Sequence, residues 1–269
     1  MRSGSEIRSR GSVVIHPTAI VDPEAELADG VEVGPYAIIS GTVKIGPRTV
    51  VGPRVTIEGY TSIGADNEIF TGAVVGSRTQ DKKFDGGVSY LKIGDRNKIR
   101  EYVTLNPGTK DGTETLVGND NLFMAYCHIA HDCIVKNKTV LANSATLAGH
   151  VVIDDGAIIG GLTGIHQFVH IGQIAIIGGC SKVVQDVPPF VMADGHPARA
   201  YGLNSVGLDR NAYSKEDKAL LKKAYKIIFR SELSLKSAIA QLEAELPQDN
   251  SAIQTLLNFL RNAPRGICD

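Results

Sequence analysis

The chain has 269 residues and a formal net charge of -1 at pH 7, with 43% hydrophobic and only 6% aromatic residues. This charge gives no reason to expect a nucleic acid or a membrane surface as partner, and no apolar run approaches the ~20 residues that cross a bilayer. Residues 1–12 are polar and lack the apolar stretch of a secretory signal. We therefore expect a disordered leader or a cloning remnant there, followed by a cytoplasmic protein with reduced cysteines.

Aliphatic residues recur at every sixth position from Ile15 onward. The register holds through Val75, resumes in phase at Ile93 and continues to Val183. A period of six fits neither an amphipathic helix nor an alternating strand, but it is typical of hexapeptide β-helix repeats. Three hexads would close one triangular coil, with the aliphatic residues stacked inside and successive coils ~4.8 Å apart. We predict that residues 13–189 form a parallel β-helix.

The repeat lapses twice without losing its register. Residues 81–92 are polar and glycine-containing, and residues 111–116 make a shorter interruption. Both lengths are multiples of six, which explains why the pattern resumes in phase. We predict loops at 81–92 and 111–116, and loops on a rigid scaffold often carry binding groups.

The sequence changes to a helical pattern in residues 190–269. Ser214 and Asp217 form a capping-box pattern at the start of one helix, and two further helical stretches end near Pro247 and before Pro264. The open end of a solenoid exposes strand edges and core. We therefore predict that residues 190–269 form an α-helical cap.

Coiling the hexads brings three histidines, His131, His150 and His166, onto one corner of the prism. Residues one coil apart stack, so Gly149 should lie beside His131 and Asp132 beside His150. These groups would gather within two coil spacings, roughly 10 Å. Two chemical uses remain open, namely zinc binding as in hexapeptide proteins of the carbonic anhydrase type, and a single histidine acting as general base. Hydrogen bonding across the coils is the purely structural alternative.

Several segments match one enzyme family closely. The most specific are His128-Ile129-Ala130-His131-Asp132-Cys133 and Gln185-Asp186-Val187-Pro188-Pro189. Further matches are Gln80-Asp81-Lys82-Lys83, Ala148-Gly149-His150, His166-Gln167-Phe168 and Tyr201-Gly202-Leu203-Asn204. On these segments the chain resembles the UDP-N-acetylglucosamine O-acyltransferases that begin lipid A synthesis, from about residue 13 to its end.

The resemblance implies the fold and the reaction. It implies a left-handed β-helix with a helical C-terminal domain, and a homotrimer with active sites between subunits. The reaction would transfer a 3-hydroxyacyl chain from acyl carrier protein to the 3-hydroxyl of UDP-N-acetylglucosamine. No metal or other cofactor is implied, because the donor is carried on the phosphopantetheine of the carrier protein.

The resemblance also assigns roles to individual residues. His131 would be the general base, Asp132 would fix its tautomer, and the Gly149 amide would stabilise the oxyanion. Residues expected to bind substrate are Asp81, Lys83, His128, His150 and His166 for the sugar or phosphate, Gln167 for the acyl or phosphopantetheine path, and Asn204 and Arg210 for the UDP phosphates. Gly179 corresponds to the residue that limits acyl length, and a glycine there predicts a longer chain.

The chain departs from the family pattern near the expected sugar and nucleotide contacts. Asn106-Pro107 stands where His-Arg or Asn-Arg is usual, and Val206 stands where an acidic residue is frequent. These departures leave open whether the acceptor carries a hydroxyl or an amine at position 3, so transfer to a related UDP-amino sugar is an alternative reaction. Arg199, Lys222 and Lys223 are candidates for docking the acidic carrier protein.

Overall fold

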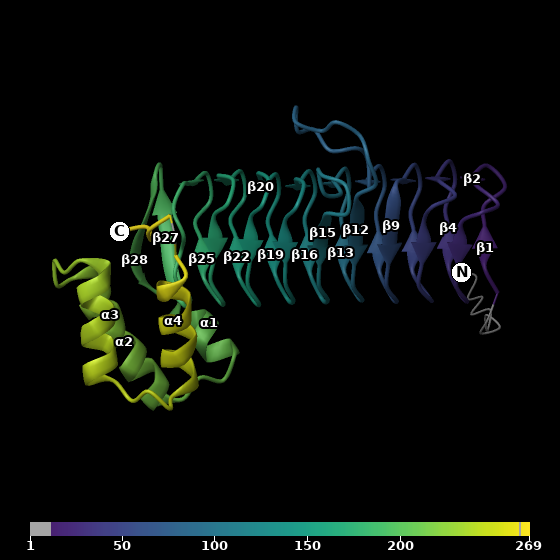
Figure 1. Cartoon of the computed structure of the whole chain (residues 1–269). Coiled ribbons are helices and arrows are strands. Elements are labelled where there is room, and N and C mark those ends of the chain that lie inside the picture. Colours follow the sequence, from purple (N-terminus) through teal and green to yellow (C-terminus); the bar gives the residue numbers. More distant parts are fainter. Residues whose placement is uncertain (1–11, 264) are drawn as a thin grey trace.

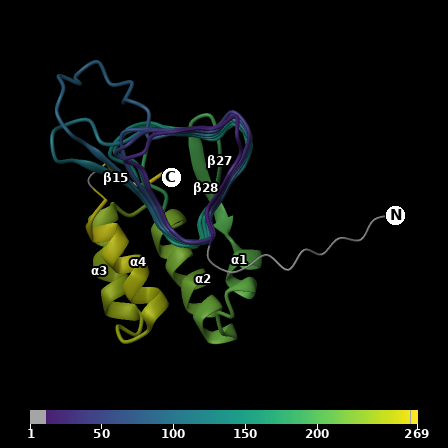
Figure 2. The same ribbon diagram turned by 90° about the vertical axis from the view of Figure 1, so that its right-hand side faces the viewer.

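The structure is a computed structural model that describes residues 12–263 and 265–269. Most of the chain forms a prism of short strands, with a group of helices at one end (Figure 1). Viewed along its axis, the coils superimpose as a triangle, and a long loop projects from one corner (Figure 2). The predicted leader falls, except for Ser12, outside the described residues.

The three faces of the prism are sheets in which each strand pairs with a strand of the next coil. The eleven-stranded sheet contains β1 (Val14–Ile15), β4 (Glu32–Val33), β7 (Val50–Val51), β10 (Glu68–Ile69), β13 (Lys98–Ile99), β16 (Leu122–Phe123), β19 (Val140–Leu141), β22 (Ile158–Ile159), β25 (Ile176–Ile177), β27 (Val191–Gly195) and β28 (Ala198–Leu203). The nine-stranded sheet contains β2 (Ile20–Val21), β5 (Ile38–Ile39), β8 (Thr56–Ile57), β11 (Val74–Val75), β14 (Thr104–Leu105), β17 (His128–Ile129), β20 (Thr146–Leu147), β23 (Gly164–Ile165) and β26 (Lys182–Val183). The eight-stranded sheet contains β3 (Glu26–Leu27), β6 (Lys44–Ile45), β9 (Tyr60–Ile63), β12 (Tyr90–Ile93), β15 (Glu114–Val117), β18 (Ile134–Val135), β21 (Val152–Ile153) and β24 (His170–Ile171).

The core of the prism is the stack of aliphatic side chains that the six-residue period predicts. Ile129 pairs with Leu147, and Leu147 pairs with Ile165, so stacked residues are one eighteen-residue coil apart. All three are buried. Truncating such a side chain to alanine typically costs about 2–5 kcal/mol of stability. Because the stacked residues are held this firmly, they fix the register of the corners that lie outside them.

The corners require residues in the left-handed backbone region. Asp132, His150 and Phe168 occupy the same corner position on successive coils, with φ of 58°, 61° and 66°. Aspartate and histidine adopt this region more readily than most residues other than glycine. The geometry of the corner therefore favours residue types that can also carry chemistry.

Both predicted loops are present, but they end earlier than residues 81–92 and 111–116 imply. Residues 90–92 belong to β12 and residues 114–116 to β15, and these two strands pair with each other along their full length. Leu91 is buried within β12, so this part of the predicted loop is coil wall. The two excursions span 76–89 and 106–113. Ile63 still pairs with Ile93, as the preserved register predicts.

The predicted all-helical tail is wrong for its first residues. β27 extends the eleven-stranded sheet in parallel with β25, and β28 returns antiparallel to β27. The helices that follow are α1 (Ser205–Arg210), α2 (Lys215–Phe229), α3 (Leu235–Glu245) and α4 (Ser251–Arg261). The three predicted helices correspond to α2, α3 and α4, and both halves of the Ser214–Asp217 capping box are present.

The helices share a second core that meets the prism at Ile174 and Phe190. The last β-helix corner is thus covered by helical side chains, as expected for the end of a solenoid. None of the described helices has the length and apolarity needed to cross a bilayer.

Candidate active site

Ionisable side chains gather on the corner between the nine-stranded and eight-stranded sheets. This histidine corner comprises residues 130–132, 148–150 and 166–168, which follow β17, β20 and β23. Each strand ends with its aliphatic residue inside the prism, so the two or three residues that follow must turn outward. The local sequence therefore presents His131 and His150 on adjacent coils.

His131 and Asp132 form the central pair of the site. His131 Nδ1 lies 2.8 Å from Asp132 Oδ2, and the same oxygen accepts the Thr109 backbone N–H at 3.2 Å. The side chains of His131 and Asp132 are only 12% and 10% exposed. Because an ionised carboxylate can only accept, Nδ1 carries the proton of the neutral ring and Nε2 keeps a free lone pair.

The first excursion brings Asp81 to the other side of the His131 ring. Asp81 Oδ2 lies 3.6 Å from His131 Nε2, and Asp81 Oδ1 accepts the Lys83 backbone N–H at 3.0 Å. The two excursions are joined by a 3.1 Å contact between the hydroxyls of Thr79 and Thr109. They border a cleft of about 540 Å³, whose lining residues are Gln80, Asp81, Lys82, Lys83, Asn106, Ala130, His131, Ala148, Gly149 and Gln167. Five of the residues predicted from the sequence therefore share one cleft.

Gly149 is required at its position by the His131 ring. A Cβ added at Gly149 would lie 2.3 Å from His131 Cε1 and 2.4 Å from Nε2. Within residues 12–263 and 265–269, the Gly149 amide has no hydrogen-bond acceptor. The cleft thus holds a bare N–H group next to a free imidazole nitrogen.

His150 lies one coil further along the corner. Its ring packs edge-on to His131 with centroids 5.1 Å apart and stacks on Phe168 at 4.5 Å. Burial lowers the pKa of His150, against the opposing effect of Asp132, and so favours the neutral ring. Its Nε2 lies 3.8 Å from Asp132 Oδ2, and its side chain is 41% exposed.

The same residues form a possible metal-binding set. One ligand atom each from His131, Asp132 and His150 lies within 4.8 Å of the other two. Two imidazoles and one carboxylate with an open position are a donor set that zinc accepts. The zinc alternative therefore has a geometric basis.

The other two predicted histidines lie beside this cluster. His128 projects from β17, where Nδ1 lies 2.7 Å from Thr104 Oγ1, and burial lowers its pKa. His166 has no recorded contact with His131 or His150 among the described residues. Its Nδ1 lies instead 3.0 Å from the Gln167 carbonyl oxygen and 3.4 Å from Arg265 Nη2. The structure thus brings two of the three corner histidines into contact.

Asn204 does not present a free side chain to a phosphate. It is 5% exposed, its Oδ1 accepts the Gly207 N–H at 2.8 Å, and its Nδ2 donates to the Ile174 carbonyl at 2.8 Å. The side chain is the N-cap of α1. This corrects the expectation of an available amide, because capping of α1 uses Oδ1 and the Ile174 carbonyl uses Nδ2. Arg210, at the end of α1, is exposed.

Arg210 and Gly179 lie at corners other than that of His131. The helix that carries Arg210 packs on Ile174, at the corner between the eight-stranded and eleven-stranded sheets. Gly179 follows β25 and precedes β26, at the corner between the eleven-stranded and nine-stranded sheets. The predicted nucleotide and acyl contacts of one chain therefore do not converge on its own His131.

Three residues with a place in the site were given no role by the sequence analysis, which noted Asn106 only as a departure from the family pattern. Asn106 is buried in the cleft wall, where Nδ2 donates to the Ser77 carbonyl at 2.9 Å and Oδ1 has no partner among the described residues. Stacking could have found it, because Asn106 lies one coil before Ala130. Thr109 and Arg265 reach the corner from an excursion and from the tail, which repeat spacing does not reveal.

Comparisons with known proteins agree with the fold. A family profile described as bacterial transferase hexapeptide (six repeats) matches residues 24–59, and one described as UDP N-acetylglucosamine O-acyltransferase, domain 2, matches residues 186–268. The acyl-[acyl-carrier-protein]–UDP-N-acetylglucosamine O-acyltransferase of Verminephrobacter eiseniae is 52% identical over 257 residues, covering 94% of this chain and 98% of that protein.

Solved structures give the same result. The UDP-N-acetylglucosamine O-acyltransferase of Moraxella catarrhalis superimposes with a TM-score of 0.91 at 42% identity, covering 95% of this chain and 99% of that one. The UDP-N-acetylglucosamine acyltransferase of Bacteroides fragilis gives a TM-score of 0.92 at 39% identity, covering 95% and 100%. The predicted fold class, a left-handed β-helix followed by a helical domain, is thereby confirmed.

Proposed function

The chain belongs to the acyl-[acyl-carrier-protein]–UDP-N-acetylglucosamine O-acyltransferase family, and we propose that it transfers a 3-hydroxyacyl chain to the 3-hydroxyl of UDP-N-acetylglucosamine. This is the first step of lipid A biosynthesis, and the donor is acyl carrier protein in the cytoplasm. The observation that carries the proposal is the His131 ring, with Nδ1 bound to Asp132 and Nε2 facing the cleft over Gly149.

His131 is the general base in this mechanism. A sugar hydroxyl is a poor nucleophile at neutral pH, so a base must take its proton as the oxygen attacks the thioester carbonyl. His131 Nε2 accepts that proton, and the carboxylate of Asp132 stabilises the imidazolium through Nδ1–H. The tetrahedral intermediate then collapses, the C–S bond breaks, and the phosphopantetheine thiolate takes the proton from Nε2. A positioned base typically contributes about 10²–10⁴ in rate.

The Gly149 amide is the proposed donor to the oxyanion. Attack on the thioester turns the carbonyl oxygen into an anion, which needs a hydrogen-bond donor in place before the reaction. Gly149 lies against the base, and its N–H is not used by the described part of the fold. Because a glycine adds no side chain, the carbonyl carbon can approach both groups at once.

The acceptor and the donor lie on different parts of the cleft in our proposal. Asp81 and Lys83 from the first excursion, with His128 and His150 from the prism wall, position the sugar and its phosphate. Arg210 binds the UDP phosphates as a charge-assisted donor, and Gln167 lines the acyl or phosphopantetheine path. Gly179 leaves the acyl channel open, so a long 3-hydroxyacyl donor is expected.

A homotrimer with sites between subunits accounts for the separation of these residues. Arg210 and Gly179 lie at corners of the prism other than that of His131. An adjacent chain would bring its own corners to the His131 cleft. The corner between the eleven-stranded and nine-stranded sheets offers an apolar surface for this contact: Tyr102 and Tyr126 stack at 5.3 Å and are 51% and 61% exposed, and Leu162 is 67% exposed.

Zinc binding is a second candidate function, favoured by the ligand set of His131, Asp132 and His150. It is second because Asp132 Oδ2 already accepts hydrogen bonds from His131 Nδ1 and the Thr109 N–H, and a zinc ion on that oxygen would displace them. Metal analysis after dialysis distinguishes the two functions. Stoichiometric zinc together with loss of transfer on chelation would favour the metal site over a metal-free base.

The acyltransferase function is tested by mass spectrometry with purified protein. The assay offers UDP-N-acetylglucosamine, or its 3-amino analogue, together with acyl carrier thioesters of different length. We expect a single 3-O-acyl product, formed fastest from a long 3-hydroxyacyl donor. Transfer only to the amino analogue would mean that the acceptor is the 3-amino sugar. No transfer to either sugar would contradict the proposed acyltransferase function.

A further inference from the structure

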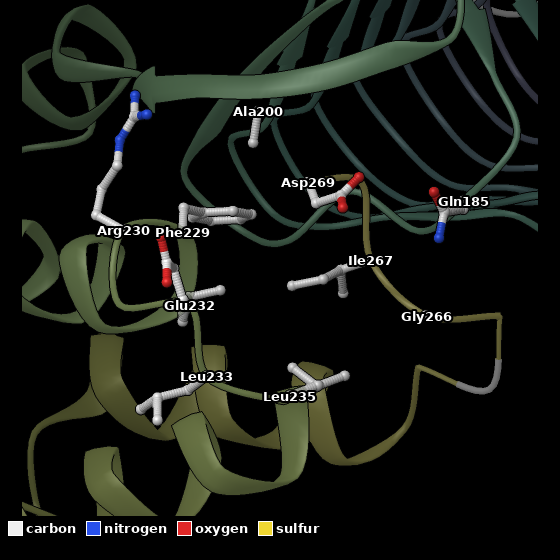
Figure 3. Close-up of a pocket in the computed structure, with 11 residues that line it drawn as sticks. Gln185, Ala200, Phe229, Arg230, Glu232, Leu233, Leu235, Gly266, Ile267 and Asp269 are labelled. Atoms are coloured by element: carbon white, nitrogen blue, oxygen red, sulfur yellow. The ribbon is translucent and has the colours of Figure 1, made fainter.

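One column of residues continues from the His131 cleft toward the helical end of the prism. His131, Gly149, Gln167 and Gln185 follow β17, β20, β23 and β26 at the same position, and these strands pair in register. Gln167 lines the His131 cleft. Gln185 lines a second hollow of about 680 Å³, in which Phe229, Leu235 and Ile267 face one another (Figure 3). The column thus has a hollow at each end.

The C-terminal segment is fixed onto this column at the second hollow. The Asp186 N–H donates to the Gly266 carbonyl at 3.1 Å, and the Cys268 N–H donates to the Asp186 carbonyl at 2.9 Å. These bonds form a parallel bridge between Asp186 and Ile267. The tail therefore returns to the histidine corner after α4, and the returning backbone determines where Arg265 lies.

Arg265 carries hydrogen-bond donors that the fold does not use. Its Nη2 lies 3.4 Å from the Val184 carbonyl oxygen and 3.4 Å from His166 Nδ1, both long for a hydrogen bond. Its Nε is buried and has no partner among the described residues. A guanidinium whose Nη2 makes only long contacts, beside an exposed imidazole, is suited to a phosphate.

The surrounding charges favour a phosphate beside Arg265 and His166 rather than inside the hollow, which the neighbouring Gly266 lines. Asp186 lies close enough for Arg265 to oppose the burial that raises the Asp186 pKa. The hollow itself is lined by Arg230 together with the carboxylates of Glu232 and Asp269, so an anion would be repelled there (Figure 3). Apart from Asp186, no carboxylate is recorded near Arg265 or His166 within the described residues.

We propose that Arg265, with His166, binds the phosphate of the donor's phosphopantetheine arm. The arm then lies along Gln185 and Gln167, and its thioester reaches Gly149 and His131. The column spans three coil spacings, roughly 14 Å, which suits an extended arm between its phosphate and its sulfur. This inference rests on the proposed acyl transfer and adds a subsite that the excursions and the catalytic pair do not supply.

The experiment compares two donors on two variants. One donor is the 3-hydroxyacyl thioester of phosphopantetheine, and the other is the same thioester of pantetheine, which lacks the phosphate. We expect removal of the phosphate to lower kcat/KM of the unmodified enzyme roughly 10-fold to 100-fold, the range of a charged hydrogen bond. Arg265→Gln should show the same loss with the phosphorylated donor and none with the pantetheine donor.

Arg261→Gln is the matched control, because Arg261 is exposed on α4 and pairs with Glu243 at 2.7 Å. It should keep the preference for the phosphorylated donor. An equal loss with both donors would make Arg265 a structural anchor of the tail and overturn the proposal, and no loss with either donor would also overturn it. If the unmodified enzyme transfers from the acyl carrier thioester but from neither small donor, the arm alone does not hold the donor and the proposal is overturned. If it does not transfer from the acyl carrier thioester either, the acyltransferase function itself fails, which is a separate result.

Discussion

Two corners of the same prism use polar residues in opposite ways. At the corner between the eight-stranded and eleven-stranded sheets, a ladder of side chains is completely buried: Thr49, Asn67, Asn97, Asn121 and Thr139, at most 1% exposed. Each joins the next coil, for example through the Asn97 Nδ2 donation to Asn67 Oδ1 at 3.0 Å and the Asn121 N–H donation to Asn97 Oδ1 at 3.0 Å. This asparagine ladder has no polar group left for a ligand.

The histidine corner is built on the same coils but leaves polar groups unused. His131 Nε2, the Gly149 N–H and Asn106 Oδ1 have no hydrogen bond recorded within the described residues, although each is wholly or largely buried. Buried polar groups are normally paired, so each exception calls for an explanation, and a ligand in the cleft would supply one here. The comparison teaches that the pairing of polar groups, rather than their presence, separates a structural corner from a candidate binding corner.

The largest expected difference between the two corners is the loss of stability caused by a substitution in the asparagine ladder. Asn97→Ala would leave the Gly118 carbonyl and the Asn121 N–H without a partner, and Asn67 Oδ1 would keep only the backbone N–H of residue 97. Each lost partner in a buried group costs about 1–3 kcal/mol, so we expect a loss of roughly 2–5 kcal/mol in unfolding free energy. Denaturant unfolding measures this loss, and acyl transfer below the transition should be nearly unchanged.

Asn258→Ala, at an exposed position of α4, is the control and should change stability by less than ~0.5 kcal/mol. If Asn97→Ala loses activity at temperatures where it is fully folded, the ladder is not purely structural and the contrast between the corners is lost.

Gly149→Ala should lower activity with little effect on stability, the reverse of Asn97→Ala. The added methyl would overlap the His131 ring at 2.3 Å, so the ring must leave its position against Asp132. We expect a loss of about 10²-fold in kcat, the lower end for a displaced base, with little change in unfolding. Gly164→Ala is the matched control, because a Cβ added at Gly164 would meet no atom within 4 Å. Equal rates for the two variants would show that the position of the ring is not critical.

The smallest expected effect is on the pH dependence of stability. Burial lowers the pKa of His128, so the unfolded chain binds this proton more readily than the folded chain. Stability from the neutral His128 is therefore complete above the ordinary histidine pKa of about 6.5 and is lost as the pH falls through it. Melting temperatures measured at neutral and mildly acidic pH should fall less in His128→Gln than in the unmodified protein. An identical fall in both would mean that His128 is not buried as a neutral ring.

The sequence was most informative where the repeat determines position. One register of aliphatic residues places His131, Gly149 and Gln167 on successive coils, so their neighbourhood could be predicted, whereas the roles proposed for them come from the resemblance to the family. The same logic explains why the asparagine ladder was not recognised: Asn67, Asn97 and Asn121 look polar in the sequence, and only their mutual hydrogen bonds show that they are structural.

The parts that could not be predicted depend on contacts between distant segments. Asp81 meets His131 through the path of an irregular excursion, and Arg265 reaches His166 because the tail pairs with Asp186. Asn204 was expected to meet a phosphate, but the start of α1 uses its side chain as a cap. Neither loop paths nor the return of the tail follow from periodicity, which reports only local register.

The most direct test is the rate of acyl transfer by His131→Ala, measured beside its thermal unfolding. If His131 Nε2 takes the proton of the sugar hydroxyl, turnover should fall by about 10²–10⁴ while the unfolding temperature stays close to that of the unmodified protein. A folded His131→Ala protein that retains full turnover would contradict the account, because the proton would then be removed by another group.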